Sequence, residues 1–156
     1  AGLPDHARLV FVGEGPMDIA IRTAAASDAR IRLVGSVPFE RMPTVMASFD
    51  TLVLPSLTTR DWCEQYGRVI TEAMASGVPV ISSRAASLAE IVGDGGLQVD
   101  PSDVADMATA LRAVLDDGHL ARDLRARGLR QAARFSWGRA VAETVAVYRR
   151  IGAQGS

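Results

Sequence analysis

The first hundred residues alternate short apolar runs with segments of helical periodicity, and this alternation is the strongest constraint on the fold. The apolar runs are expected to be strands: Arg8 to Gly13, Ile31 to Gly35, Asp50 to Pro55, Val78 to Ser82 and Gly96 to Asp100. Helices are expected between them: Met17 to Ala26, Phe39 to Phe49, Gly67 to Ser76 and Ser87 to Val92. Strands separated by helices indicate an α/β fold with a doubly wound parallel sheet, in which ligands bind at the carboxyl ends of the strands.

From residue 101 to the end the pattern is helical throughout. Ser102 or Asp103 is expected to cap a first helix that stops at Gly118, and a second helix follows from His119 to Arg134. A third helix begins after Ser136 and carries an apolar stripe: Trp137, Val141, Val145, Tyr148 and Ile151. Such a stripe is typical of core packing, so its aromatic residues are interpreted as packing anchors. Residues 1–100 and 101–156 are therefore expected to form one domain of 1–156 with a helical carboxyl-terminal extension.

Composition excludes several classes of function. The formal net charge of −1 and the scattered basic residues argue against nucleic acid as a partner. No apolar run approaches the roughly 20 residues of a membrane span. The single cysteine, Cys63, cannot form an intramolecular disulfide, which favours a cytoplasmic location. The seventeen basic residues other than histidine are all arginine, and His6 and His119 are isolated, so neither a lysine mechanism nor a metal site is expected.

The segment Glu64–Ser83, EQYGRVITEAMASGVPVISS, holds the candidate site. Glu64 follows the third expected strand, Gly67 opens a helix, and Glu72 lies in its second turn, away from the apolar face. A helix N-terminus presents unpaired N–H groups and partial positive charge to a phosphate, and a glycine there allows close approach. Carboxylates beside such a site are good acceptors for sugar hydroxyls. The combination points to a phosphorylated sugar.

This segment resembles the E-x7-E region of the retaining glycosyltransferases of family 4, which have the GT-B fold. The resemblance extends to LVFVGEGP and LVLPS before the segment, and to SLAEIVGDGGLQVDPSD and RFSW after it, so it covers nearly the whole chain. It implies the Rossmann-like carboxyl-terminal domain, which binds a nucleotide diphosphate sugar as donor. The implied enzyme is of the hexosyltransferase type, transfers the sugar with retention, and needs no metal or other cofactor.

The resemblance also implies roles for individual residues. Glu64, the catalytic carboxylate, would accept from hydroxyls of the transferred sugar, and Glu72 would accept from the ribose hydroxyls. The sugar and diphosphate would meet backbone amides of Gln65, Tyr66, Gly67, Arg68 and Val69. Arg68 departs from the commoner aliphatic residue of the family and adds a charge near the phosphates. Two glycine turns complete the expected donor site, with Gly13 after the first strand and Val37, after Gly35, bordering the base.

Each assignment has a plain structural alternative. Arg68 and Glu72 are spaced i, i+4 and could form a surface ion pair contributing about 0.3–0.5 kcal/mol. Glu64 could simply complement the helix dipole, Gly13 could serve the turn alone, and Glu90 could be an exposed helix acid as well as a residue of the crevice. Two other functions stay open, a GT-B nucleotide-sugar epimerase and a non-catalytic binding module with a vestigial site. The E-x7-E spacing favours the transferase over the epimerase, and the intact Glu64, Gly67 and Glu72 argue against a vestigial site.

In the resembled family the donor domain begins with one further strand and helix, whose turn brings an Arg and a Lys to the diphosphate. That strand lies between the first and third strands of this chain, so a gap with unpaired backbone groups is expected there. We therefore expect a piece of a longer enzyme, or a gap filled by another segment or by self-association. The acceptor, a sugar, lipid or small molecule, would need the amino-terminal domain of that enzyme, which could sit peripherally at the inner membrane. The chain alone is expected to be inactive.

Overall fold

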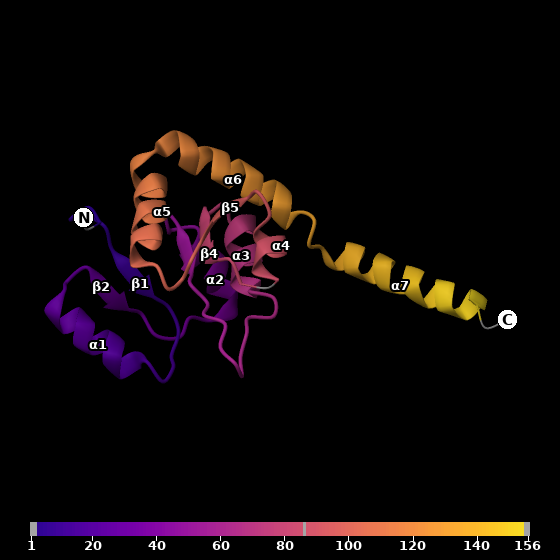
Figure 1. Cartoon of the computed structure of the whole chain (residues 1–156), viewed down its shortest axis with the longest axis horizontal. Coiled ribbons are helices and arrows are strands. Elements are labelled where there is room, and N and C mark those ends of the chain that lie inside the picture. Colours follow the sequence, from indigo (N-terminus) through magenta and orange to yellow (C-terminus); the bar gives the residue numbers. More distant parts are fainter. Residues whose placement is uncertain (1–2, 86, 155–156) are drawn as a thin grey trace.

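The computed structural model describes residues 3–85 and 87–154 and has the expected α/β alternation (Figure 1). The strands in these ranges are β1 (Leu9–Phe11), β2 (Ile31–Leu33), β3 (Leu52–Leu54), β4 (Val80–Ser83) and β5 (Gly96–Val99). The helices are α1 (Asp18–Ser27), the 3-10 turn η1 (Phe39–Arg41), α2 (Met42–Met46), α3 (Arg68–Ala75), α4 (Leu88–Val92), α5 (Val104–Asp116), α6 (Gly118–Ala132) and α7 (Trp137–Gln154). The fold class is thereby confirmed.

Most helix boundaries lie within one or two residues of those expected, and two of the differences have a local cause. The helix expected over Phe39 to Phe49 is divided into η1 and α2, because Pro43 stands in the first turn of α2, where its missing N–H is tolerated. Gly118 begins α6 instead of ending α5. The side chain of Asp117 accepts hydrogen bonds from the backbone N–H groups of His119 and Leu120, which caps α6 one residue early.

The strands fall into two parallel sheets, β1–β2 and β3–β4–β5. Leu9 is in register with Ile31 in the first sheet, and in the second sheet Val80 stands between Leu52 and Gly96. Among the described residues β1 and β3 each pair on one side only, so the break expected between the first and third strands is confirmed. Both strands therefore keep a free edge of backbone donors and acceptors.

Strand β4 is the centre of the core, since all four of its residues are completely buried. Its side chains alternate between two apolar clusters, as the pleat of a strand requires. Val80 packs into a cluster built mainly by α3 and α4, and Ile81 packs into one built by α5, α6 and β5. Figure 1 shows α5 on one side of the β3–β4–β5 sheet and α3 and α4 on the other, with α6 running along the top. A strand buried on both faces explains the uninterrupted apolar run VPVI in the sequence.

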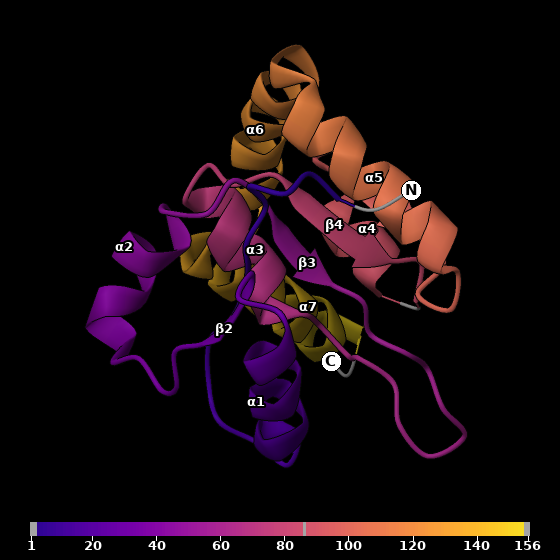
Figure 2. The ribbon, with the colours of Figure 1, turned by 90° about the vertical axis from the view of Figure 1, so that its left-hand side faces the viewer.

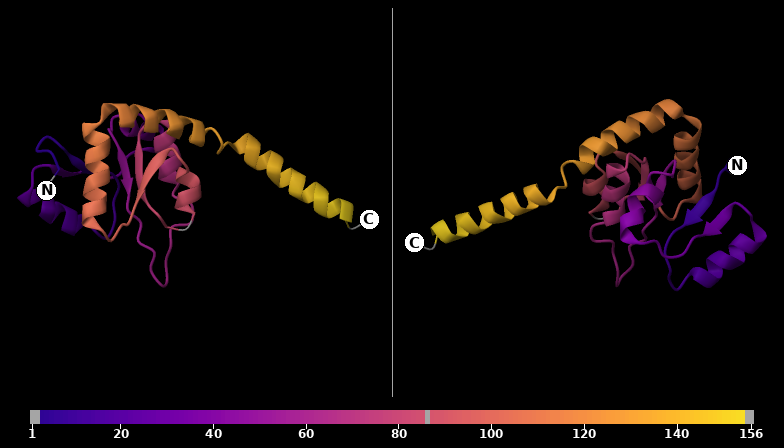
Figure 3. Two further views of the ribbon diagram at one scale, coloured as in Figure 1. Left: turned by 45° about the horizontal axis from the view of Figure 1, so that its top comes forward. Right: turned by 180° about the vertical axis from the view of Figure 1, so that it is seen from behind.

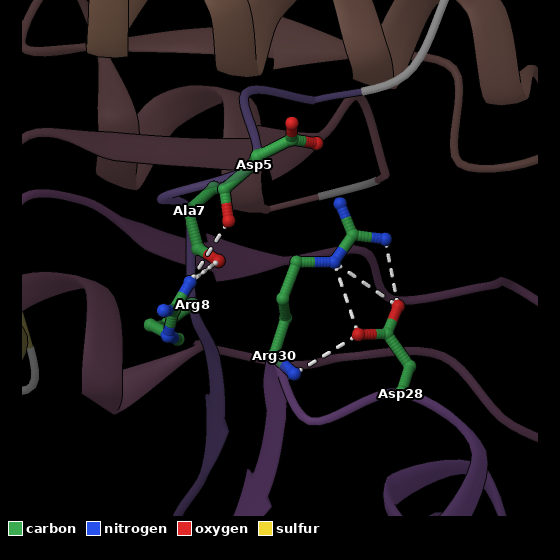
Figure 4. A network of polar contacts seen from close by, with 5 residues as sticks. All are labelled: Asp5, Ala7, Arg8, Asp28 and Arg30. Atoms are coloured by element: carbon green, nitrogen blue, oxygen red, sulfur yellow. Dashed lines mark hydrogen bonds and ion pairs between the residues drawn. The ribbon is translucent and has the colours of Figure 1, made fainter.

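The lobe of β1, β2 and α1 is less buried than the sequence suggested. An uninterrupted apolar run such as the one around β1 is typical of a buried strand, but Leu9 and Phe11 are 47% and 37% exposed, and α1 has no buried residue. Burial requires a second layer or neighbour, and β1 has β2 alone. Helix α1 of this lobe lies at the bottom of the view in Figure 2, opposite α6 at the top. Side-chain hydrogen bonds from Arg30 lower the pKa of Asp28 to about 2 and fix the turn between α1 and β2 (Figure 4).

The apolar stripe of α7 is exposed, which corrects its interpretation as core. Trp137 is 88% exposed and Tyr148 is 70% exposed, and the other stripe residues are exposed as well. Figures 1 and 3 show α7 running away from the body of the molecule. Periodicity specifies that a helix has one apolar face, but it does not specify what covers that face. No helix in the described parts of the chain is long and apolar enough to cross a membrane.

Gly67 is the N-cap residue of α3, and its backbone is both left-handed and tightly packed. The φ of Gly67 is +63°, and a Cβ built on it would stand 2.6 Å from Cδ2 of the completely buried Leu88. Ile70, Ala73 and Met74 are buried on the inner face of α3. The glycine thus lets the loop that follows β3 enter α3 directly against Leu88 of α4.

We expect Ser83→Ala to stabilise the protein. Ser83 is completely buried and its Oγ has no hydrogen-bond partner among the described residues, so the hydroxyl was desolvated without compensation. Its removal should raise the free energy of unfolding by about 1 kcal/mol. Ser82 is equally buried, but its Oγ donates to the Ser83 carbonyl at 3.2 Å, so Ser82→Ala should lower stability by about 1 kcal/mol. Thermal unfolding followed by circular dichroism measures both, and a destabilised Ser83→Ala would contradict the assignment.

Gly67→Ala should destabilise the protein by about 2–4 kcal/mol, because the left-handed φ and the contact with Leu88 act together. In a Leu88→Ala background the contact is removed, and the same change should cost only about 1 kcal/mol for the backbone conformation. Urea unfolding of the four proteins in this double-mutant cycle gives the coupling. An equal cost of Gly67→Ala in both backgrounds would show that the contact is unimportant.

Candidate functional site

The loop from β3 to α3 turns the carboxylate of Glu64 onto the start of α3. Oε1 of Glu64 accepts from the backbone N–H of Gly67 at 3.0 Å and, more weakly, from that of Tyr66 at 3.4 Å. These N–H groups have no partner within the helix, so the carboxylate satisfies them and complements the helix dipole. This is the alternative role considered for Glu64 from the sequence, in which its carboxylate complements the dipole of the helix. The arrangement also shows that this loop presents its amides to an anion.

Ser87 lies in the connection between β4 and β5, at the start of α4, and its side chain contacts the backbone of the same loop. Its hydroxyl lies 3.3 Å from the carbonyl oxygen of Glu64 and in shorter contact with that of Gln65. The side chain of Gln65 folds back on the loop, with its Nε2 donating to the Cys63 carbonyl at 3.3 Å. The backbone that carries the candidate catalytic carboxylate is thus held by tertiary contacts.

Arg68 and Glu72 form an ion pair on the surface of α3. Nε of Arg68 lies 3.5 Å from Oε1 of Glu72, and the two side chains are 81% and 38% exposed. This is the pair that i, i+4 spacing predicts, and at such exposure it contributes little to stability. Val69 is partly buried against the core, so only its backbone can reach a ligand. Both charges of the pair are accessible.

Glu72 stands between two hollows of the surface. One, of about 290 Å³, is apolar and is lined by Phe39, Met42 and Met46 together with Ala75 of α3. The other, of about 750 Å³, extends along Tyr66, Arg68 and Glu90 to the segment between α6 and α7. Tyr66 packs edge-on against Phe135 of that segment, with ring centroids 6.3 Å apart. The structure therefore brings the motif residues Glu64 to Glu72 together around the start of α3.

Gly13 and Val37 lie on the other sheet, in the turns at the carboxyl ends of β1 and β2. The N–H of Gly13 donates to the Gly35 carbonyl at 2.7 Å, which joins the two turns. A second bond runs from the N–H of Ser36 to the Glu14 carboxylate at 3.4 Å. The predicted site residues thus lie in turns that follow strands or in the first two turns of α3, but they belong to the two separate sheets.

Sequence reasoning missed three residues that shape this region. Ser87 was expected only as a helix start, although its hydroxyl holds the Glu64 loop. Gln131 of α6 is 4% exposed and donates to the carbonyl oxygens of Glu90 and Ile91, which closes the end of α4. Phe39 lines the apolar hollow beside Glu72. The signals in the sequence are weak, because each contact joins residues distant along the chain. Within the described ranges, no three His, Cys, Asp or Glu side chains gather as a metal ion would require.

Known proteins with similar sequences are glycosyltransferases. The chain is 40% identical over 119 residues to O-antigen chain mannosyltransferase B of Escherichia coli, covering 76% of this chain and 30% of that protein. It is 33% identical over 139 residues to a D-inositol 3-phosphate glycosyltransferase of a Nocardioides species, with coverage of 88% and 29%. An MMP alpha-(1->4)-mannosyltransferase of Mycolicibacterium hassiacum is 35% identical over 138 residues, with coverage of 86% and 32%. The chain thus spans about a third or less of the length of these relatives.

Solved structures share the fold at low sequence identity. Sucrose-phosphate synthase from Thermosynechococcus elongatus superposes with a TM-score of 0.77 at 24% identity, covering 97% of this chain and 47% of that one. HepE of Anabaena, solved in complex with UDP, gives a TM-score of 0.77 at 23% identity, with coverage of 92% and 42%. The shared fold is the GT-B type, which agrees with the two-sided α/β arrangement of this chain.

A family profile covers the larger part of the chain. The family described as "Glycosyl transferases group 1" matches residues 2–117, which include both strand sheets, the Glu64 loop and all of α3 and α4. This chain therefore belongs to the group 1 glycosyl transferases.

Proposed function

We propose that this chain is the nucleotide-sugar donor-binding part of a retaining, metal-independent family 4 glycosyltransferase of the hexosyltransferase type. The observation that carries the proposal is the clustering of Glu64, Glu72 and the amides that open α3 at the carboxyl end of β3. Named relatives transfer mannosyl or other glycosyl groups, and structural neighbours were solved with UDP and UDP-glucose. Family and geometry agree on the same ligand class.

Glu72 is proposed to accept hydrogen bonds from the ribose hydroxyls of the donor. Its side chain is 38% exposed and borders the apolar hollow of about 290 Å³. Met46, 3% exposed, belongs to the buried side of that hollow, and Phe39, 77% exposed, lies at its open side. A flat heterocyclic base suits such an apolar space next to a carboxylate that takes the ribose. In this arrangement Val37, two residues before Phe39, borders the base.

The diphosphate would lie at the start of α3, where backbone amides and Arg68 supply positive potential. Amides of Gln65 to Val69 would meet the sugar and phosphate oxygens, and Glu64 would accept from the sugar hydroxyls. Fixed donors aimed at a leaving group stabilise the charge that develops on it during transfer. Arg68 is 81% exposed in the absence of ligand, so it can reach a bound phosphate without losing buried contacts.

The chain by itself is proposed to bind the donor without transferring sugar. The chain spans about a third or less of the length of its relatives, and the groups that hold an acceptor sugar, lipid or small molecule are proposed to belong to a longer enzyme. Loss of even one preorganised electrostatic donor lowers a rate by roughly 10²–10³. The free edges of β1 and β3 suit a strand from another segment of a longer enzyme or from a second copy. The cytoplasm, with peripheral contact at the inner membrane for a full-length enzyme, is proposed as the location.

A nucleotide-sugar epimerase and a non-catalytic module remain the alternatives. The named relatives are transferases, which favours transfer over epimerisation. Ordered contacts around Glu64 argue against a vestigial site, because Ser87 and the amides of Tyr66 and Gly67 all fix this loop.

We expect Glu72→Ala to weaken nucleotide binding by about 10–100-fold, the loss that follows from removing a charged hydrogen-bond acceptor. Ligand-observed NMR of the chain with UDP, GDP, ADP and their common sugar conjugates measures this and identifies the base. Asp123→Ala is the matched control, because Asp123 also pairs with an arginine at i, i+4 spacing but on α6. Equal affinity of Glu72→Ala and the wild type would exclude the ribose role. Failure of the folded wild type to bind any of these ligands would remove the proposed function.

A further inference from the structure

We propose that Glu64 is a built-in competitor for the donor's diphosphate, so that the site selects a nucleotide sugar over the bare nucleoside diphosphate. The inference rests on the proposed function of this site and adds a specificity-determining step to it. In the structure Oε1 of Glu64 accepts hydrogen bonds from the backbone N–H groups of Gly67 and Tyr66, at 3.0 and 3.4 Å. These are among the amides that an incoming diphosphate would use. One acceptor must leave before the other can bind.

Electrostatics makes the two acceptors exclusive. A carboxylate and a phosphate sharing one pair of N–H groups would place like charges within a few ångströms of each other. The N–H groups also point along the start of α3, where the partial positive charge of the helix favours one anion. The Glu64 carboxylate therefore stays bound to these amides until a ligand offers it other hydrogen-bond donors.

Only the side chain of Glu64 has to move for the exchange. Its backbone is held by the Ser87 hydroxyl, which contacts the carbonyl oxygens of Glu64 and Gln65. Gly67 is fixed by close packing against the buried Leu88. The glutamate side chain is only partly buried, so it can rotate about its own torsions while the amides stay in place. The amide site is thus preorganised, and the competitor is mobile.

The two forms of the nucleotide differ in what they offer the displaced carboxylate. A nucleotide sugar carries hydroxyl donors next to the diphosphate, so Glu64 exchanges two amide hydrogen bonds for hydrogen bonds from the sugar. A bare nucleoside diphosphate has no such donors and carries extra negative charge on its terminal phosphate. Glu64 would then lose its partners and face a like charge. Return of the carboxylate to the amides would favour release of the nucleotide once the sugar is gone.

The test compares the affinities of UDP with UDP-glucose, and of GDP with GDP-mannose, by isothermal titration. Glu64→Gln keeps the length and an oxygen acceptor for the Gly67 N–H but removes the charge. It should tighten binding of the bare nucleotide by about tenfold and so reduce the preference for the nucleotide sugar by at least that factor.

A second readout follows the amide directly. In ¹⁵N-resolved spectra without ligand, Glu64→Ala should shift the Gly67 N–H signal, and UDP should then restore a hydrogen-bonded shift at that position. Unchanged preference in Glu64→Gln, in a chain that binds nucleotide and loses it with Glu72→Ala, would overturn the competition while leaving the proposed function intact. A folded wild type that binds neither form overturns both.

Discussion

The complete burial of β4 is the constraint on which the rest of this structure depends. With no exposed residue, the strand can exist only when helices cover both of its faces. One face requires α3 and α4, and the other requires α5 and α6. Placing α3 and α4 side by side brings Gly67 against Leu88 and Ser87 against the Glu64 loop. The geometry of the candidate site is therefore a consequence of how the central strand is covered.

Much of the β3–β5 half could be predicted from the sequence, because its local and tertiary preferences agree. The apolar face of α3, with Ile70, Ala73 and Met74, has helical periodicity and is buried as that periodicity predicts. Asp103 was one of two expected caps of α5, and its carboxylate accepts from the N–H groups of Ala105 and Asp106. In these segments the pattern that forms the element also identifies its buried side.

Burial could not be predicted where an apolar segment lacks a neighbour. Leu9 and Phe11 have the character of a core strand, yet they are exposed because β1 pairs on one edge only. The stripe of α7 is likewise regular and uncovered. For the site, the sequence motif identified Glu64 and Glu72. The hydrogen bond of the Glu64 carboxylate to the Gly67 amide, however, depends on the side-chain rotamer of Glu64 and on the contact of its backbone with Ser87, 23 residues away. No pattern in the sequence encodes either.

Because α7 is uncovered, the tryptophan that it carries is exposed to solvent. The chain has two tryptophans: Trp62, in the loop that leads to Glu64, is 53% exposed, and Trp137, at the start of α7, is 88% exposed. Neither lies in the clusters around β4. Their emission would therefore change little when the core melts, and would respond chiefly to molecules that settle on the loop or along α7. For this chain, tryptophan fluorescence is a probe of docking more than of unfolding.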